Sequence, residues 1–431
     1  MKLAQMFVSL LLPPIAALVS APLLARALGQ TGRGEVAAAN APILFTTAVL
    51  TFGLGDAATY FIARNKHRST SLTFRVLAGF TALGALSAVF TWAAAPVLSR
   101  GNAQLAELLV LTAAATVPTF VTFGIRAIAS GIQAFDLLAR EAMITSSIRL
   151  AATIALFISG HLSVLSATLV FLLSPVVGAI ALLPVFRRIP VNSDLPTARY
   201  TELFGYGHRI WLGALSGVVL SRIDQLLMVP LSSEAELGIY VVAVAIGELP
   251  SVVAAGVRAI TFSADSAEAE GAAASTALRL QMMARMTATA SFIAAGAGIA
   301  LTPWAIPVFF GEEFRPAILP AIVLLIATAA GSAGSVGGAG LSARGRPGLR
   351  SLSMLFGALA NLLVFFLLVP HTGALGAALA TLAGSWVAGT ANLIALSRVF
   401  GMPVSSFYGI RRSDLHVIIS TISRRKGNHA A

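Results

Sequence analysis

The chain has 431 residues, of which 57% are hydrophobic and 11% are charged, with a mean hydropathy of +0.87 and a formal net charge of +12. A chain this apolar cannot be water-soluble over most of its length, and its repeated hydrophobic stretches of about 20 residues have the length of helices that cross a bilayer. It has no cysteine, which excludes disulfides and thiolate metal sites, and none of its lysines precedes Ser or Thr, which excludes a phosphate-binding loop.

The hydropathy pattern predicts about twelve membrane-spanning helices. In chain order, they are expected near residues 6–28, 36–63, 72–98, 104–132, 142–160, 163–186, 206–230, 236–261, 280–302, 316–341, 351–370 and 373–397. The first outer loop then holds Arg33 and Glu35. If the chain starts inside, most loop arginines lie on the cytoplasmic side, which is the positive-inside distribution. We therefore predict an all-α polytopic integral membrane protein with both termini cytoplasmic, in which the basic charge reflects topology and not a nucleic-acid partner.

The two halves of the chain resemble each other. Residues 131–186 align with 340–400, and His161 and His371 fall in matching outer turns. The six histidines show no metal-binding spacing, so no metal or cofactor is expected. Six spans in each half give the copies one orientation, as in a parallel repeat. We expect two six-helix lobes, 1–186 and 202–400, joined by a cytoplasmic linker, 187–201. For the tail, 401–431, an amphipathic helix on the inner leaflet and a disordered segment stay open.

Arginines inside the predicted spans are the first candidate functional residues, because a charge within a bilayer is costly and usually has a role. Arg149 and Arg222 lie deep in their spans, and Arg126 is intermediate. Arg26, Arg209 and Arg258 lie nearer the span ends, where they can bind substrate or anchor to lipid headgroups. A pyrophosphate is the kind of ligand that such residues fit, because the arginine fork pairs with phosphate oxygens.

Carboxylates inside the spans form the second group of candidates. Glu248, Asp56 and Asp224 either bind a coupling proton or cation, or simply pair with an arginine. Pro250 follows Glu248 and predicts a kink that can act as a hinge. The small-residue run 331–340 indicates either close helix packing or a sliding gate surface.

Four stretches of the chain carry a family resemblance. They are Ala25–Glu35, Gly53–Arg64, Arg222–Tyr240 and Phe310–Phe314. In order and spacing, they resemble the polysaccharide-exporting branch of the multidrug/oligosaccharidyl-lipid/polysaccharide (MOP) exporter superfamily, over residues 1 to about 400. The resemblance implies a two-lobed fold like that of the MATE transporters, with a cationic central cavity. It also implies a bacterial inner-membrane flippase, not an enzyme, that moves polyprenyl-pyrophosphate-linked oligosaccharides by alternating access. Its partners would be the lipid bilayer, and a polysaccharide polymerase and glycosyltransferases of the same pathway.

Three other functions are weighed against this one. A cation-coupled multidrug exporter of the same superfamily would need a cavity dominated by carboxylates, whereas the deep charges here are mostly arginines. A glycan polymerase or glycosyltransferase would need a large outer loop with catalytic acids, and the predicted outer loops are short. A scaffold without transport activity would leave the arginines inside the spans unexplained.

Overall fold

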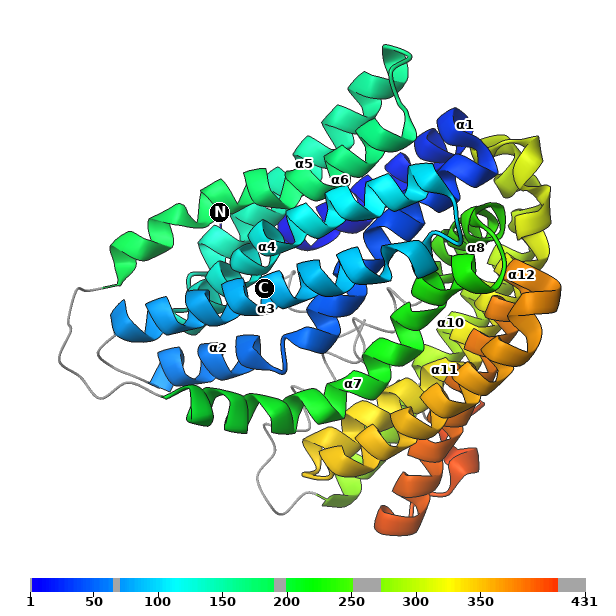
Figure 1. Ribbon diagram of the computed structural model, residues 1–431. Coiled ribbons are helices and arrows are strands. Elements are labelled where there is room, and N and C mark those ends of the chain that lie inside the picture. The colour runs from blue at the N-terminus through cyan, green and yellow to red at the C-terminus, as the bar shows by residue number, and fades with distance from the viewer. Residues whose placement is uncertain (1, 65–69, 190–198, 251–272, 410–431) are drawn as a thin grey trace, which may run out of the picture. The chain divides into compact units, whose positions relative to one another are not determined.

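The computed structural model describes residues 2–64, 70–189, 199–250 and 273–409, and these residues form helices without a strand (Figure 1). The first half contains α1 (Lys2–Leu50), α2 (Leu54–Arg64), α3 (Thr70–Leu98), α4 (Ala103–Gly131), α5 (Phe135–Ile158), α6 (Val164–Gly178) and the 3-10 helix η1 (Ala179–Arg188). The second half contains α7 (Tyr200–Leu231), α8 (Glu234–Gly247), α10 (Ala273–Phe310), η2 (Glu312–Ala317), α11 (Ile318–Ala343), α12 (Pro347–Phe400) and η3 (Val404–Phe407). The predicted all-α fold is confirmed.

Two glycines divide the longest helices into separate legs. Gly29 in α1 has φ +64° and Gly373 in α12 has φ +52°, a left-handed backbone conformation that a residue without Cβ adopts readily. A third break lies between α1 and α2, where Phe52 and Gly53 both have positive φ. A Cβ on Gly53 would clash with the backbone of Gly207 in α7, so this break is also a site of close helix contact.

The structure corrects two predicted boundaries. The first outer loop does not extend over 29–35, because the helix resumes directly after Gly29. Arg33 and Glu35 are therefore helical and buried, with 8% and 6% of their surface exposed. The fifth span begins at Phe135 instead of residue 142, because the connection from α4 is only three residues long. Glu141 is consequently inside a helix and not in a loop.

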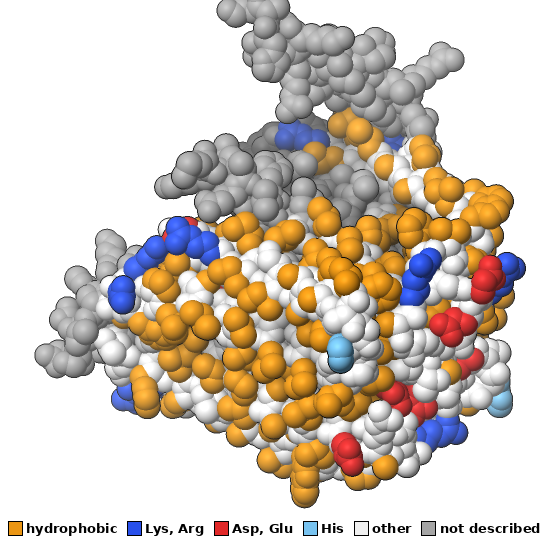
Figure 2. All heavy atoms as spheres, turned by 90° about the horizontal axis from the view of Figure 1, so that it is seen from above, with side chains coloured by type: hydrophobic (Ala, Val, Ile, Leu, Met, Phe, Trp, Pro, Cys, Tyr) orange, Lys and Arg blue, Asp and Glu red, His pale blue; other side chains and the backbone are white. Residues whose placement is uncertain are grey.

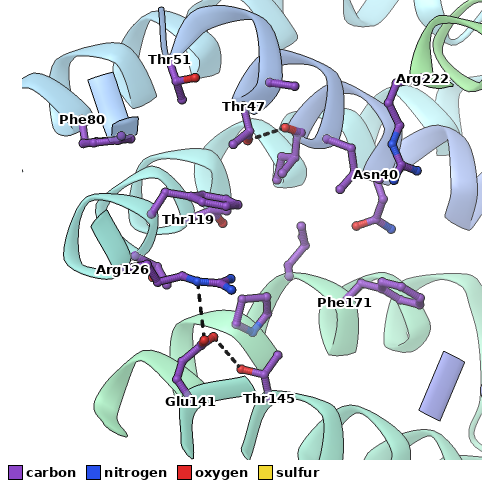
Figure 3. Close-up of a pocket in the computed structure, with 18 of the residues that line it drawn as sticks. Asn40, Thr47, Thr51, Phe80, Thr119, Arg126, Glu141, Thr145, Phe171 and Arg222 are labelled. Atoms are coloured by element: carbon purple, nitrogen blue, oxygen red, sulfur yellow. Dashed lines mark hydrogen bonds and ion pairs between the residues drawn. The ribbon is translucent and has the colours of Figure 1, made fainter. Parts of the chain in front are cut away.

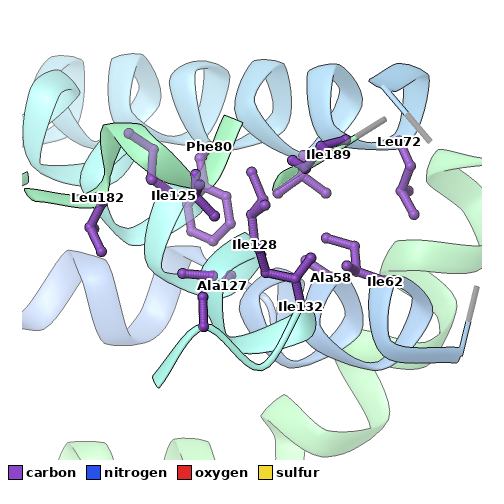
Figure 4. Close-up of a cluster of buried hydrophobic side chains, with 14 of the residues drawn as sticks. Ala58, Ile62, Leu72, Phe80, Ile125, Ala127, Ile128, Ile132, Leu182 and Ile189 are labelled. Atoms are coloured by element: carbon purple, nitrogen blue, oxygen red, sulfur yellow. The ribbon is translucent and has the colours of Figure 1, made fainter. Parts of the chain in front are cut away.

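The first of two compact units comprises Met1–Val242, Ala305–Ala317 and Val369–Ala374. An apolar cluster in this unit joins α2, α3, α4, the start of α5, η1 and the start of α7 (Figure 4). Phe80 and Phe120 are almost completely buried, at 1% and 0% exposure. Truncating such a side chain to alanine typically costs about 3–5 kcal/mol, so this cluster holds these helices firmly together.

The second unit comprises Ala243–Trp304, Ile318–Leu368 and Leu375–Ala431. One apolar cluster of this unit packs Leu280, Val336, Leu393 and Phe407 from α10, α11, α12 and η3. The small-residue run of α11 lies against the second leg of α12, where a Cβ on Gly334 would clash with Gly389. Small residues that let helix backbones approach are typical of helix packing in membranes. The lobe boundaries and the cytoplasmic placement of the termini stay predictions.

The surface supports a membrane location. Eight of the described helices are long and apolar enough to cross a bilayer. Large apolar side chains such as Phe74, Trp92 and Ile158 are exposed, as expected for a surface covered by lipid. Hydrophobic side chains are spread widely over the described part of the face seen in Figure 2, and charged side chains are fewer there. The chain is a multi-pass membrane protein. Residues 410–431 of the tail, for which an amphipathic helix and a disordered segment stay open, lie outside the described residues.

Candidate functional site

The first unit contains a cavity of about 990 Å³ that is lined by α1 to α7 and by Val241 in the middle of α8. Threonines, Asn40, Gln225 and apolar side chains form most of its wall (Figure 3). Its charged residues are four arginines and two carboxylates, Arg33, Arg126, Arg149, Arg222, Asp56 and Glu141. The cavity therefore carries an excess of two positive charges.

Arg149 lies near the middle of α5, about 21 Å along the helix from Phe135. Its Nε donates a long hydrogen bond of 3.3 Å to Ser174 Oγ of α6. Its guanidinium carbon lies 4.6 Å from the centre of the Phe171 ring, in a cation–π contact. Among the described residues, it has no carboxylate partner within salt-bridge distance. The charge is thus held in place by neutral groups, and its remaining N–H donors are available to a ligand.

Arg126 differs, because it has a carboxylate partner. Its Nε lies 3.6 Å from Glu141 Oε2. The Arg126 side chain is 44% exposed, whereas the Glu141 side chain is only 2% exposed. Thr145 Oγ1 donates a hydrogen bond of 3.1 Å to Glu141 Oε1. Figure 3 shows these three residues at one end of the pocket, with Arg222 and Asn40 away from them. The arginine therefore faces the cavity, and the carboxylate lies behind it in the wall.

Arg222 and Arg33 bring two more positive charges to the wall. Arg222 lies in α7, is exposed, and lines the cavity. Arg33 is 8% exposed, and its buried Nε has no hydrogen-bond partner. Neither arginine has an ion pair in the described part of the chain. A buried guanidinium without an ion-pair partner is costly, so Arg33 is a candidate ligand-binding residue.

The two predicted carboxylates of this unit occupy different environments. Asp56, in the first turn of α2, is exposed and lines the cavity. Asp224 is 5% exposed and accepts hydrogen bonds from the Tyr240 hydroxyl of α8 and, at 2.8 Å, from the Gln225 N–H. Asp224 does not line the cavity. It joins the hairpin of α7 and α8, because its place two positions after Arg222 puts it on another face of the helix.

The other predicted site residues are not among those that line the cavity, or lie outside the described atoms. Arg26 donates hydrogen bonds to the carbonyls of Phe309, at 2.9 Å, and Val308. Glu248 follows α8 in the second unit and is exposed, and Pro250 beyond it is buried. Arg209 lies in α7, but its side chain is outside the described atoms, and Arg258 lies outside the described residues. The roles assigned to all the sequence candidates stay predictions.

Sequence reasoning did not select Arg33 and Glu141. Both had been placed in loops, because the predicted spans began at residues 36 and 142. The sequence feature that could have indicated Arg33 is Gly29. A single glycine can break a helix without a loop, so Arg33 lies one turn inside the next helix. The signal for Glu141 was the helix-compatible stretch from Phe135, which continues directly into the fifth span.

The sequence model of one family, described as polysaccharide biosynthesis protein, matches residues 3–260, which is more than half of the chain. The match includes every helix that lines the cavity. No curated protein matches the sequence.

Several solved structures share the fold. A multidrug resistance MATE family transporter of the MOP superfamily, in an inward-facing conformation, is 17% identical with a TM-score of 0.71, over 92% of this chain and 98% of the other. The lipid II flippase MurJ, in an inward closed conformation, is 13% identical with a TM-score of 0.74, over 93% and 88%. The MATE multidrug transporter DinF-BH is 14% identical with a TM-score of 0.60, over 92% and 94%. At these identities the likeness establishes the shared fold, and does not establish a substrate.

Proposed function

The chain belongs to the polysaccharide biosynthesis protein family, and from this premise we propose that it moves polyprenyl-pyrophosphate-linked oligosaccharide across the bacterial inner membrane by alternating access. The observation that carries the proposal is the cavity with four arginines, of which only Arg126 is ion-paired within the described residues. The fold is that of membrane transporters. We infer no catalytic role for the cavity.

The charge of the cavity favours a pyrophosphate over a cation. A pyrophosphate carries its negative charge on several oxygens in a small volume, and each guanidinium can bind two of them in parallel. The four arginines come from α1, α4, α5 and α7, so they approach the cavity from different directions. The neutral polar groups between them, such as Asn40 and Thr119, suit the hydroxyl groups of a sugar.

A multidrug exporter is the second candidate, because two of the solved structures with this fold are multidrug transporters. Asp56 and Glu141 are the cavity carboxylates that could attract a cation. Glu141 is already paired with Arg126, so Asp56 alone faces the cavity as an unpaired negative group among the described residues. One carboxylate against three unpaired arginines is unfavourable for a cationic drug.

Transport of the two substrate classes by the same vesicles decides between these functions. Purified protein in proteoliposomes is given either a fluorescent polyprenyl-pyrophosphate oligosaccharide, whose flipping exposes it to an impermeant quencher, or a lipophilic cationic dye. The proposal predicts flipping of the lipid-linked sugar above that of protein-free vesicles, and no transport of the dye. Dye transport without flipping would instead establish the exporter. If the proposal holds, the polymerase and glycosyltransferases that make and use this substrate are the expected partners.

A further inference from the structure

The charged residues of the cavity are divided between two ends. On α5, about 12 Å of helix separate Glu141 from Arg149. Figure 3 shows Arg222 on the side of the cavity opposite to Arg126 and Glu141. We call the end with Arg149 and Arg222 the donor end, because a guanidinium only donates hydrogen bonds, and the end with Arg126 and Glu141 the acceptor end.

Threonine hydroxyls line the acceptor end, and their protons are already used within the protein. Thr122 and Thr119 lie one and two turns before Arg126 on α4, and they donate to backbone carbonyls of the same helix at 3.0 and 2.8 Å. Thr59 of α2 donates to the carbonyl of Ala127, next to Arg126, at 3.3 Å. A hydroxyl that already donates its proton offers only lone pairs to a ligand. The three threonine oxygens therefore act as hydrogen-bond acceptors.

Two carboxylates add to the acceptor character of this end. Asp56 is exposed, lines the cavity and lies about one turn before Thr59 on α2. Glu141 lies behind Arg126, with Oε2 at 3.6 Å from the arginine Nε. One guanidinium thus stands against two carboxylates here, whereas the two arginines of the donor end have no ion pair among the described residues.

The two ends suit different parts of one ligand. A pyrophosphate only accepts hydrogen bonds, so it fits the donor end. A sugar hydroxyl both donates and accepts, so it can donate to the threonine oxygens and accept from the remaining N–H groups of Arg126. We infer that the acceptor end is a subsite for an uncharged sugar, and that it selects against an acidic sugar joined to the pyrophosphate. The inference rests on the proposed function, because the pyrophosphate must occupy the donor end.

A sugar carboxylate is disfavoured at the acceptor end for two reasons. It only accepts hydrogen bonds, so the threonine oxygens offer it no partner. It would also share the end with Asp56 and Glu141, and charges of the same sign repel each other. Arg126 is the single guanidinium there and already faces Glu141, so its attraction for a further carboxylate is largely offset.

The test is titration calorimetry of the full-length protein in detergent with three probes. They are geranyl pyrophosphate and its conjugates with glucose and with glucuronic acid, each joined to the terminal phosphate. The two conjugates carry the same pyrophosphate and differ only at C6 of the sugar, which is a hydroxymethyl group in one and a carboxylate in the other. The wild type is expected to bind the glucose conjugate at least about tenfold more tightly than the glucuronic acid conjugate.

Variants assign this preference to the acceptor end. The double variant Thr119→Val and Thr122→Val removes two acceptors, so it should bind the glucose conjugate at least about fivefold more weakly while binding geranyl pyrophosphate as wild type does. Asp56→Asn should bind the glucuronic acid conjugate at least about threefold more tightly, because one negative charge is removed. Thr81→Val is the matched control. Its hydroxyl also donates to a carbonyl of its own helix, at 2.8 Å, and it does not line the cavity.

The outcomes separate the sugar subsite from the proposed function. Equal affinity of the wild type for the two conjugates, or tighter binding of the glucuronic acid conjugate, would overturn the sugar subsite and leave the cationic cavity standing. So would an unchanged preference in both the threonine double variant and Asp56→Asn. Absence of geranyl pyrophosphate binding to the wild type would overturn the cationic cavity, and the subsite with it. Thermal unfolding of each variant, measured in parallel, verifies that it is folded.

Discussion

Replacing Arg149 by alanine is expected to weaken anion binding while leaving the protein folded. The stability cost follows from the contacts that are lost. The hydrogen bond to Ser174 is long, at 3.3 Å, and Ser174 can bond within its own helix instead. The cation–π contact with Phe171 contributes about 0.5–2 kcal/mol. Since no carboxylate in the described residues loses a partner, we expect a destabilisation of no more than about 2 kcal/mol.

The loss of binding should be larger. A charge-assisted hydrogen bond contributes about 1.5–3 kcal/mol, and each 1.4 kcal/mol is about tenfold in affinity. Arg149→Ala should therefore bind geranyl pyrophosphate about 10- to 100-fold more weakly than wild type. Arg149→Lys keeps the charge but loses the planar fork, so its affinity should lie between the two.

The assay combines a binding isotherm with thermal unfolding of the same preparation. Arg140→Ala is the matched control, because Arg140 is an exposed arginine of the same helix and does not line the cavity. Arg126→Ala provides the contrast. It leaves Glu141 buried without its counter-charge, so it should destabilise the protein more than Arg149→Ala, towards the lower end of the about 3–5 kcal/mol known for broken buried pairs.

Two results would refute this reasoning. If Arg149→Ala bound the probe as tightly as Arg140→Ala, the guanidinium would not be a ligand. If Arg149→Ala unfolded at a temperature far below Arg126→Ala, the arginine would have a structural role that its observed contacts do not explain.

Three further substitutions test the packing and the charges of the first unit. Gly34→Ala should lower the free energy of unfolding by about 1–3 kcal/mol, and with it the thermal midpoint, because the new methyl group meets the backbone of α8. The control Gly296→Ala should leave the midpoint unchanged, because this position on α10 has open space around it. Tyr240→Phe should lower the free energy of unfolding by about 1–3 kcal/mol, because the buried Asp224 carboxylate loses a hydrogen-bond donor. An unchanged midpoint in thermal unfolding would show that the Tyr240 hydroxyl does not stabilise Asp224. Arg33→Met should raise the thermal midpoint, because the free energy of unfolding increases by about 1–4 kcal/mol, and it should weaken geranyl pyrophosphate binding in a binding titration. A lowered midpoint would argue against an uncompensated charge at Arg33.

The sequence was sufficient for the class of fold, because span length and hydropathy are imposed by the bilayer and not by details of packing. It also placed Arg149 and Arg222 deep in their spans, and both line the cavity. It did not show which neighbours they have. Ser174 and Phe171 lie on a different helix from Arg149, more than 20 positions along the chain, and no pattern of hydropathy indicates that contact.

Arg33 and Glu141 were both missed for the same reason, which is that the predicted helix ends were misplaced. Hydropathy averages over many residues, so a charged residue at the start of a span shifts the predicted boundary past itself. Arg33 and Glu141 were excluded from the membrane in this way, although a single Gly29 and the short α4–α5 connection place both inside helices. The pairing of Arg126 with Glu141 could be found only after both helices were seen to meet in the cavity wall.

The most direct measurement of the central claim is the rate at which proteoliposomes flip a fluorescent polyprenyl-pyrophosphate oligosaccharide, compared among wild type, Arg149→Ala, Arg222→Ala and Arg140→Ala. The cationic cavity predicts that the first two variants flip at least about tenfold more slowly than wild type, and that Arg140→Ala flips at the wild-type rate. Normal flipping by both Arg149→Ala and Arg222→Ala would contradict the account.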